Sequence, residues 1–427
     1  MWAAHSRGGP RSGPGGGEPC DGSALCRGPA PVAMARSAAL VALVALAACA
    51  APSGPRAPDV GAPAETGAFV TLLGDDTLAV ERFARTPGGM EATVALRAPR
   101  STLTAYDLRL DADGGLVSYE AVARQPLSGE VVRRQSVRPD GDSLRVTVAE
   151  ASGGPTSRTV PGAARPLPFV DMVHWPFELM VARAVAAGGP LDQPLFTERG
   201  AVAFTSTVAP DGAVTVRHPF RGPMAVEADA EGRLLTLDAG ATTRKLVVRR
   251  VADVDVEGAA ARWARLDAAG QAVGDLSGRG EAVATIGGAT VAVDYGVPQK
   301  RGREVWGALV PWGEVWRTGA NRATHLTTSR PLVLDPDGVA LAVPAGTATL
   351  FSVPRPDGGL LIVNRQTGQG GTAYDEARDL GRVPMTRSAL DDTVEAFTIA
   401  VEPDGDGGRL VLRWDRDAFS VPFVVAD

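Results

Sequence analysis

The stretch VEPDGDGGRLVLRWDRDAFSVPFVV, residues 401–425, joins a tight-turn sequence to a run rich in branched apolar and aromatic residues. Pro presets the φ angle of the first turn corner, Asp suits the second, and Gly accepts the left-handed conformation that closes a hairpin. The tripeptide Pro-Asp-Gly recurs between similar runs, at 139–141, 210–212, 336–338, 356–358 and 403–405. The chain is therefore predicted to be mainly antiparallel β.

One segment departs from this pattern: HWPFELMVARAVAAGG, residues 174–189. Pro176 stands where a helix begins, and Gly188 and Gly189 stand where it would stop. The segment is apolar almost all round, which predicts a buried helix packed against a curved sheet. A curved sheet with an internal helix is typical of lipid carriers, so lipid carriage by this domain is one hypothesis. The other is a helix that only closes its own core.

The length and composition fit two domains. The chain has 427 residues, 44% of them hydrophobic, and single cores rarely grow beyond about 250–300 residues. Residues 266–281 are Gly-rich and polar, which predicts a linker. We expect a first domain at 68–265, a curved antiparallel sheet with one buried helix, and a second at 282–427, a β-sandwich.

The start of the chain predicts export. Residues 1–33 are rich in Gly, Pro and Arg and are interpreted as a mispredicted or disordered extension, with Met34 as the true start. Residues 34–48 combine a charged Arg36 with a short apolar run, the pattern of a signal peptide. Small residues then precede Cys49, as in a bacterial lipobox, so Cys49 is the predicted lipidation site. Residues 49–67 form a Pro/Gly/Ala-rich tether. We expect a lipid-anchored envelope protein, at the outer membrane and facing the periplasm or surface.

Several chemistries lack their signatures. The net charge is -6 without a basic block, so no nucleic-acid partner is predicted. The histidines outside the leader (His174, His218 and His325) show no i, i+4 spacing, and no metal site or cofactor is predicted. Neither a nucleophile elbow nor a Walker loop is present. A carboxylate pair for hydrolysis of envelope polymers stays an open alternative, because such pairing is spatial. Residues 374–379, YDEARD, are interpreted as a solvated loop.

Four segments of the last third carry a family resemblance. They are GREVWGALVPWGEVWRTGANRATHLT (302–327), VPAGTATLFSVP (343–354), LLIVNRQT (360–367) and YDEARDLGRVPM (374–385). In order and spacing they resemble the bacterial family called domain of unknown function 2911, over roughly residues 285–425. The resemblance implies a β-sandwich of secreted or lipid-anchored envelope proteins. It implies no established activity.

The candidate site is centred on the WRTGAN motif. Trp316 offers a stacking face, Arg317 and Asn321 offer directional donors, and His325 follows closely. Asn364 and Tyr374 join them because the matching family segments carry an Asn and a Tyr. The alternative is that Arg317 locks a loop shaped by Gly319 and Asn321. The predicted role is a binding or structural module for a small polar ligand, a glycan, a lipid or a partner protein, and no reaction is predicted.

Overall fold

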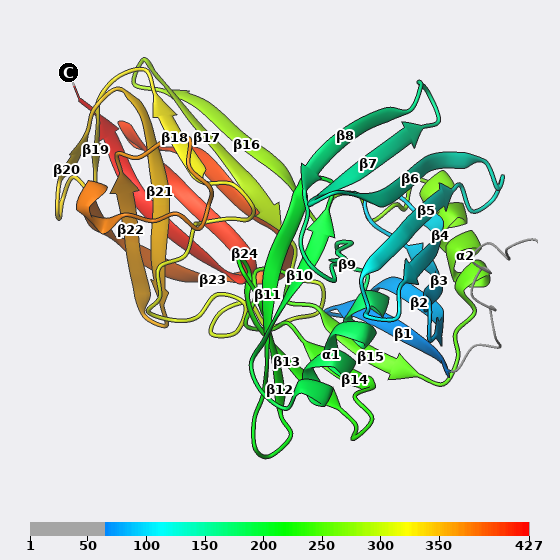
Figure 1. Ribbon diagram of the computed structural model, residues 1–427. Helices are drawn as coiled ribbons and strands as arrows, with labels where there is room; N and C mark the ends of the chain where they lie inside the picture. The colour runs from blue at the N-terminus through cyan, green and yellow to red at the C-terminus, as the bar shows by residue number, and fades with distance from the viewer. Residues whose placement is uncertain (1–64, 427) are drawn as a thin grey trace, which may run out of the picture. The chain divides into compact units, whose positions relative to one another are not determined.

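The structure, a computed structural model, describes residues 65–426. The predicted extension, the signal peptide, Cys49 and most of the tether lie outside the described residues. Strand β1 begins at Glu65, so the last three residues of the predicted tether belong to the first strand. Two sheets account for the strands of the described residues, and each sheet is described by itself (Figure 1).

The first sheet has fifteen strands, which are antiparallel except for the β9–β10 pair. Their bounds are β1 Glu65–Leu73, β2 Asp76–Thr86, β3 Gly89–Leu96, β4 Thr102–Leu110, β5 Leu116–Arg124, β6 Val131–Asp140, β7 Ser143–Glu150, β8 Thr156–Pro161, β9 Leu167–Pro168, β10 Leu191–Thr197, β11 Gly200–Val208, β12 Val214–His218, β13 Gly222–Ala228, β14 Leu234–Asp238 and β15 Val247–Val251.

Almost every strand of this sheet pairs with its neighbours in sequence. The order runs from β8 back to β1, then from β15 back to β9. The pairing of β1 with β15, which aligns Ala68 with Val251, is the one junction between strands distant in sequence. The predicted turns lie where strands reverse: residues 139–141 join β6 to β7, and 210–212 join β11 to β12. Gly141 and Gly212 have φ angles of 61° and 86°, as a closing turn residue requires.

The predicted helix is α1, Trp175–Ala187, and its ends are as expected. Pro176 occupies the first turn, and Gly188 caps the C-terminus with a φ of 66°. The side chain of His174, the N-cap residue, makes no cap hydrogen bond. Instead Glu81 of β2, which is fully buried, accepts hydrogen bonds from the backbone N–H groups of His174 (2.9 Å) and Trp175 (2.8 Å). A strand therefore supplies the capping carboxylate of the helix.

Side chains fill the space between α1 and the first sheet. Phe69, Tyr119, Trp175 and Phe196 are at most 2% exposed and belong to one apolar cluster with α1. The pocket beside the start of α1, next to Phe177, has a volume of about 30 Å³, enough for a water molecule or two. Ligand pockets measure about 300–1,000 Å³, so this filled interior does not favour the lipid-carriage hypothesis.

A second helix, α2 Val256–Ala268, was not predicted. It packs against the other face of β2, β3 and β4 (Figure 1), where Val256, Ala259, Ala260 and Trp263 meet Val80 and Ala95. Three alanines and a glycine in the first two turns leave few large apolar residues, so the 3.6-residue period is weak in the sequence. Its last three residues fall in the predicted linker, 266–281. None of the helices in residues 65–426 has the length and apolar character needed to span a membrane.

The second sheet has nine antiparallel strands. They are β16 Ser277–Ile286, β17 Ala289–Pro298, β18 Thr324–Thr328, β19 Leu332–Leu334, β20 Leu341–Val343, β21 Gly346–Arg355, β22 Gly358–Asn364, β23 Asp379–Asp404 and β24 Gly407–Val425, with a short 3-10 helix at Glu376–Arg378. The first part of β23 pairs with β22 and the rest with β24. Its later half also packs across β16 and β17, where Tyr295 meets Phe397 edge-on at 5.8 Å. The sheet thus folds over itself into two layers, as a sandwich does.

Candidate functional site

The predicted loop between β17 and β18 is tightly constrained. Thr318, Gly319 and Asn321 have φ angles of 52°, 152° and 63°. Gly and Asn adopt positive φ readily, but the β-branched Thr318 does so only where its surroundings support the turn. Gly296 of β17 passes directly beneath this turn, since a Cβ atom there would lie 1.8 Å from the carbonyl oxygen of Ala320. The backbone N–H of Ala320 donates to the carbonyl oxygen of Gly296 at 3.2 Å. The loop therefore has one defined shape.

Trp316 lies in the aromatic core of the second sheet. Its indole stacks on Trp414, with ring centroids 6.0 Å apart, and meets the edges of Trp306 and Phe397. Its backbone exchanges two hydrogen bonds with Ser352, at 2.7 and 2.8 Å. These contacts engage the ring face that the sequence assigned to ligand stacking.

Arg317 combines partial burial with the lack of a polar partner among residues 65–426. Its side chain passes close to Gly371, since a Cβ atom on that glycine would lie 2.8 Å from Cδ of Arg317. The residue is half-buried, and burial lowers the pKa of its guanidinium. No hydrogen bond or ion pair joins this guanidinium to any side chain or carbonyl within residues 65–426. Partly buried charges usually have partners, so Arg317 retains its capacity to bind an anion.

Asn321 and His325 lie at the two ends of the same loop region. Asn321 is exposed, and its Nδ2 donates to the carbonyl oxygen of Ser277 at 3.1 Å. His325 of β18 is half-buried, and its Nε2 is 3.5 Å from the backbone N–H of Gly368. Burial lowers the pKa of His325, so its imidazole is neutral near pH 7. The loop at 366–373 thus touches both His325 and Arg317.

Asn364 and Tyr374 meet at a residue that the sequence analysis missed, Asp379. Nδ2 of Asn364, which is fully buried, donates to the Asp379 carboxylate at 2.9 Å. The Tyr374 hydroxyl donates to the same carboxylate at 2.7 Å and accepts from Arg382 at 2.9 Å. Arg382 also bonds Asp379, at 2.9 Å, and Glu376. Burial, helped by the bond to Asp379, raises the pKa of Tyr374 to about 12.

This network satisfies its own polar groups, so it shapes the loop at 365–379. The interpretation of residues 374–379 as a solvated loop was therefore incomplete, because Tyr374 and Asp379 belong to an ordered network. The sequence offered one signal for this network: Arg382 follows Asp379 by three residues in the family segment at 374–385. Only the fold brings Asn364 to the same carboxylate.

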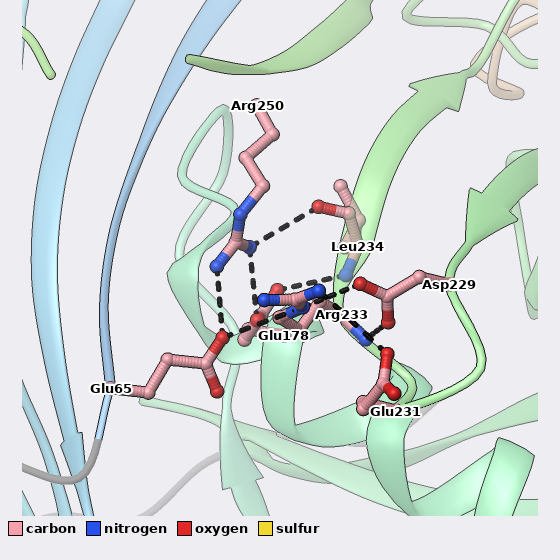
Figure 2. Close-up of polar contacts among 7 residues, drawn as sticks. All are labelled: Glu65, Glu178, Asp229, Glu231, Arg233, Leu234 and Arg250. Carbon is pink, nitrogen blue, oxygen red and sulfur yellow. Dashed lines mark hydrogen bonds and ion pairs between the residues drawn. The ribbon is translucent and has the colours of Figure 1, made fainter. Parts of the chain in front are cut away.

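The first domain holds a separate network of buried charge that the sequence did not reveal (Figure 2). Glu178 of α1 is fully buried and accepts from Arg250 and from the backbone N–H of Leu234, each at 3.0 Å. Burial raises the pKa of Glu178, and Arg250 opposes that rise. Arg250 also contacts Glu65 at 3.3 Å, and Glu65 lies 3.7 Å from Arg233. The network ties α1 to β1, β14 and β15.

A metal centre is not suggested by the described part of the chain. No group of three or more His, Cys, Asp or Glu residues within 65–426 is placed to hold an ion.

The fold and the loops define a class: a mainly β protein with a helix-bearing curved sheet and a second antiparallel sheet that carries an ordered loop cluster. Residues 277–423 match the family described as "Protein of unknown function (DUF2911)", which confirms the resemblance seen in the sequence. The match covers the C-terminal third of the chain.

Among solved structures, the chain is similar to a β-barrel-like protein of domain of unknown function DUF1849 from Brucella abortus. The identity is 14% and the TM-score 0.27, and the match covers 44% of this chain and 94% of that chain. No curated protein matches the chain.

Proposed function

We propose that the protein is a lipid-anchored envelope protein whose second domain binds an anionic ligand through Arg317. The ligand is a small anion, or an acidic group carried by a glycan or a partner protein. Export and anchoring through Cys49 are supported by the signal-peptide and lipobox sequence. They would place the site in the periplasm or at the cell surface.

One observation carries the binding role: the half-buried guanidinium of Arg317 has no partner within residues 65–426. Desolvating a charge without a partner lowers stability, so a bound carboxylate or phosphate group would offset that cost. The planar guanidinium can bind either group through two parallel hydrogen bonds.

The other predicted residues divide into two groups. Asn321 and His325 lie on the same loop region and are the candidates to contact the ligand beside Arg317. Trp316, Asn364 and Tyr374 are engaged within the protein, and in this proposal they hold the loop in shape. Arg317 therefore acts from a preorganised loop, which limits the entropy lost on binding.

Native purification of the acylated protein tests the proposal. We expect lipid, glycan or protein that co-purifies with the wild type to be lost from Arg317→Ala. The matched control is Arg322→Ala, which removes an exposed arginine from the same loop and is expected to retain the material. Identical co-purifying material from the wild type and Arg317→Ala would contradict the proposal.

A further inference from the structure

A groove of about 670 Å³ runs along the exposed side of α1 in the first domain. One wall is apolar and contains Leu179 and Ala182 of the helix. The opposite wall is made by the β2–β3 and β4–β5 turns, where Pro87 and Leu110 add apolar surface. Its volume is within the usual range for small-molecule sites, about 300–1,000 Å³.

Three arginines line this groove: Arg85 at the end of β2, Arg165 before β9, and Arg183 of α1. Arg85 and Arg183 are half-buried, and Arg165 is exposed. A Cβ atom placed on Gly114 would lie 3.0 Å from Nη2 of Arg165 and 3.1 Å from Nη2 of Arg183. Two guanidinium groups thus converge on one point of the groove.

The three positive charges have no carboxylate partner within residues 65–426. Arg183 donates only to two carbonyl oxygens, those of Arg165 and Gly114, each at 3.0 Å. These bonds fix the guanidinium without neutralising it. Burial, reinforced by the charges of Arg165 and Arg85, lowers the pKa of Arg183 to about 10. The fold therefore maintains a mutual repulsion in a protein whose net charge is -6.

The carboxylates along the same groove are mostly engaged elsewhere. Glu65 faces Arg250 and Arg233, at 3.3 and 3.7 Å, and Glu231 faces Arg233 at 3.7 Å (Figure 2). Asp111 accepts backbone N–H groups from its own turn, at 2.7 and 2.9 Å. The fourth, Asp113, is exposed at the turn. None of the four forms an ion pair with the three arginines.

We propose that Arg85, Arg165 and Arg183 form a binding site for a phosphate group. A phosphate monoester carries a charge of about -1.5 to -2 and three strong acceptor oxygens, which suits several converging guanidinium groups. Its charge relieves the repulsion among the arginines, and the apolar wall of α1 accommodates the rest of a larger ligand. The site is separate from Arg317 and goes beyond the function proposed above.

Titration of the full-length chain with inorganic phosphate tests the site. Cys49→Ser is introduced throughout, so that the chain cannot be acylated at that residue. We expect saturable binding that Arg85→Gln and Arg165→Gln each weaken by roughly tenfold or more, because each removes a charge-assisted contact. Arg134→Gln, an exposed arginine of β6 outside the groove, is expected to bind as the parent does. Arg317→Gln is titrated beside it, because phosphate bound at the Arg317 site is lost from that variant while binding in the groove is retained.

Thermal unfolding distinguishes a binding role of Arg85 from a purely structural one. In phosphate-free buffer Arg85→Gln should unfold at or above the temperature of the parent, because it removes repulsion. Added phosphate should raise the unfolding temperature of the parent more than that of the variant.

Vesicles identify the source of the phosphate group. The same chains are mixed with two kinds of vesicle. One kind is made of phosphatidylcholine alone, and the other of phosphatidylcholine and phosphatidic acid in equal parts. Arg85-dependent binding to the phosphatidic acid vesicles supports the site with a lipid headgroup as ligand. Arg85-dependent binding of inorganic phosphate alone supports it with a free phosphate.

The proposal is overturned if neither probe binds, or if Arg134→Gln weakens binding as much as Arg85→Gln. It is also overturned if Arg317→Gln alone among the variants weakens binding. That last result would leave the function proposed for Arg317 intact.

Discussion

Glu81→Gln tests whether a strand residue caps the buried helix α1. The Glu81 carboxylate is fully buried and accepts the backbone N–H groups of His174 and Trp175, at 2.9 and 2.8 Å. The substitution keeps the shape of the side chain. It replaces one acceptor oxygen with an amide that donates, and it removes the negative charge at the positive end of the helix.

The expected loss follows from these contacts. A hydrogen bond to a charged group contributes about 1.5–3 kcal/mol, and a charge at a helix end contributes up to about 2 kcal/mol in partly buried sites. Glutamine keeps one of the two acceptors, so we expect Glu81→Gln to lower the unfolding free energy of the first domain by about 2–4 kcal/mol. Glu81→Ala should lower it further, because it leaves both N–H groups buried without an acceptor.

Denaturant unfolding of the Cys49→Ser chain separates the two domains. Both α-helices of the described residues belong to the first domain, so the helical circular dichroism signal follows that domain. Tryptophan fluorescence mainly follows the second domain, which holds Trp306, Trp312, Trp316 and Trp414. Only the dichroism transition should shift in Glu81→Gln.

The matched control is Glu120→Gln, which removes a half-buried carboxylate paired with Arg138 at 2.7 Å. Surface ion pairs of this kind contribute about 1 kcal/mol or less. A Glu81→Gln shift no larger than that of the control would refute the capping role.

Three further predictions concern other parts of the chain. Gly296→Ala places a Cβ atom 1.8 Å from the carbonyl oxygen of Ala320. It should lower the denaturant midpoint of the fluorescence transition, which corresponds to a loss of about 1–3 kcal/mol or more in the unfolding free energy of the second domain. Gly278→Ala, with nothing within 4 Å, should leave that midpoint nearly unchanged. Burial lowers the pKa of His218 from 6.5 to about 4. The folded state therefore resists its protonation, and stability should fall as pH drops from about 6.5 towards 4. His218→Asn should show a smaller loss in denaturant titrations at those pH values. Cys49→Ser should move the protein from the membrane to the soluble fraction on cell fractionation, and unchanged fractionation would contradict the lipid anchor.

The sequence was most informative where local chemistry decides the structure. The Pro-Asp-Gly tripeptides mark five hairpin turns, and Pro176 and Gly188 mark the ends of α1, because φ preferences act within a few residues. Helix α2 was missed because small residues make up much of its buried face, and tertiary packing decides such helices.

The candidate sites depend on contacts between distant residues. Asn364 and Tyr374 were identified from the family segments, but their shared partner Asp379 is visible only in the fold. Arg85 and Arg183 come from different elements almost a hundred residues apart, and no sequence period relates them. Pairing across such separations is set by topology, which a single sequence does not encode in any local pattern.

The junction between β1 and β15 has a consequence for biosynthesis. β1 is the first described strand to leave the ribosome, and its partner at Val247–Val251 is the last strand of the same sheet. Until that partner emerges, one edge of β1 has free N–H and C=O groups, which can pair with another nascent chain. A chain interrupted before Val247 would keep that edge open permanently. We therefore expect such an interrupted chain to accumulate as insoluble material.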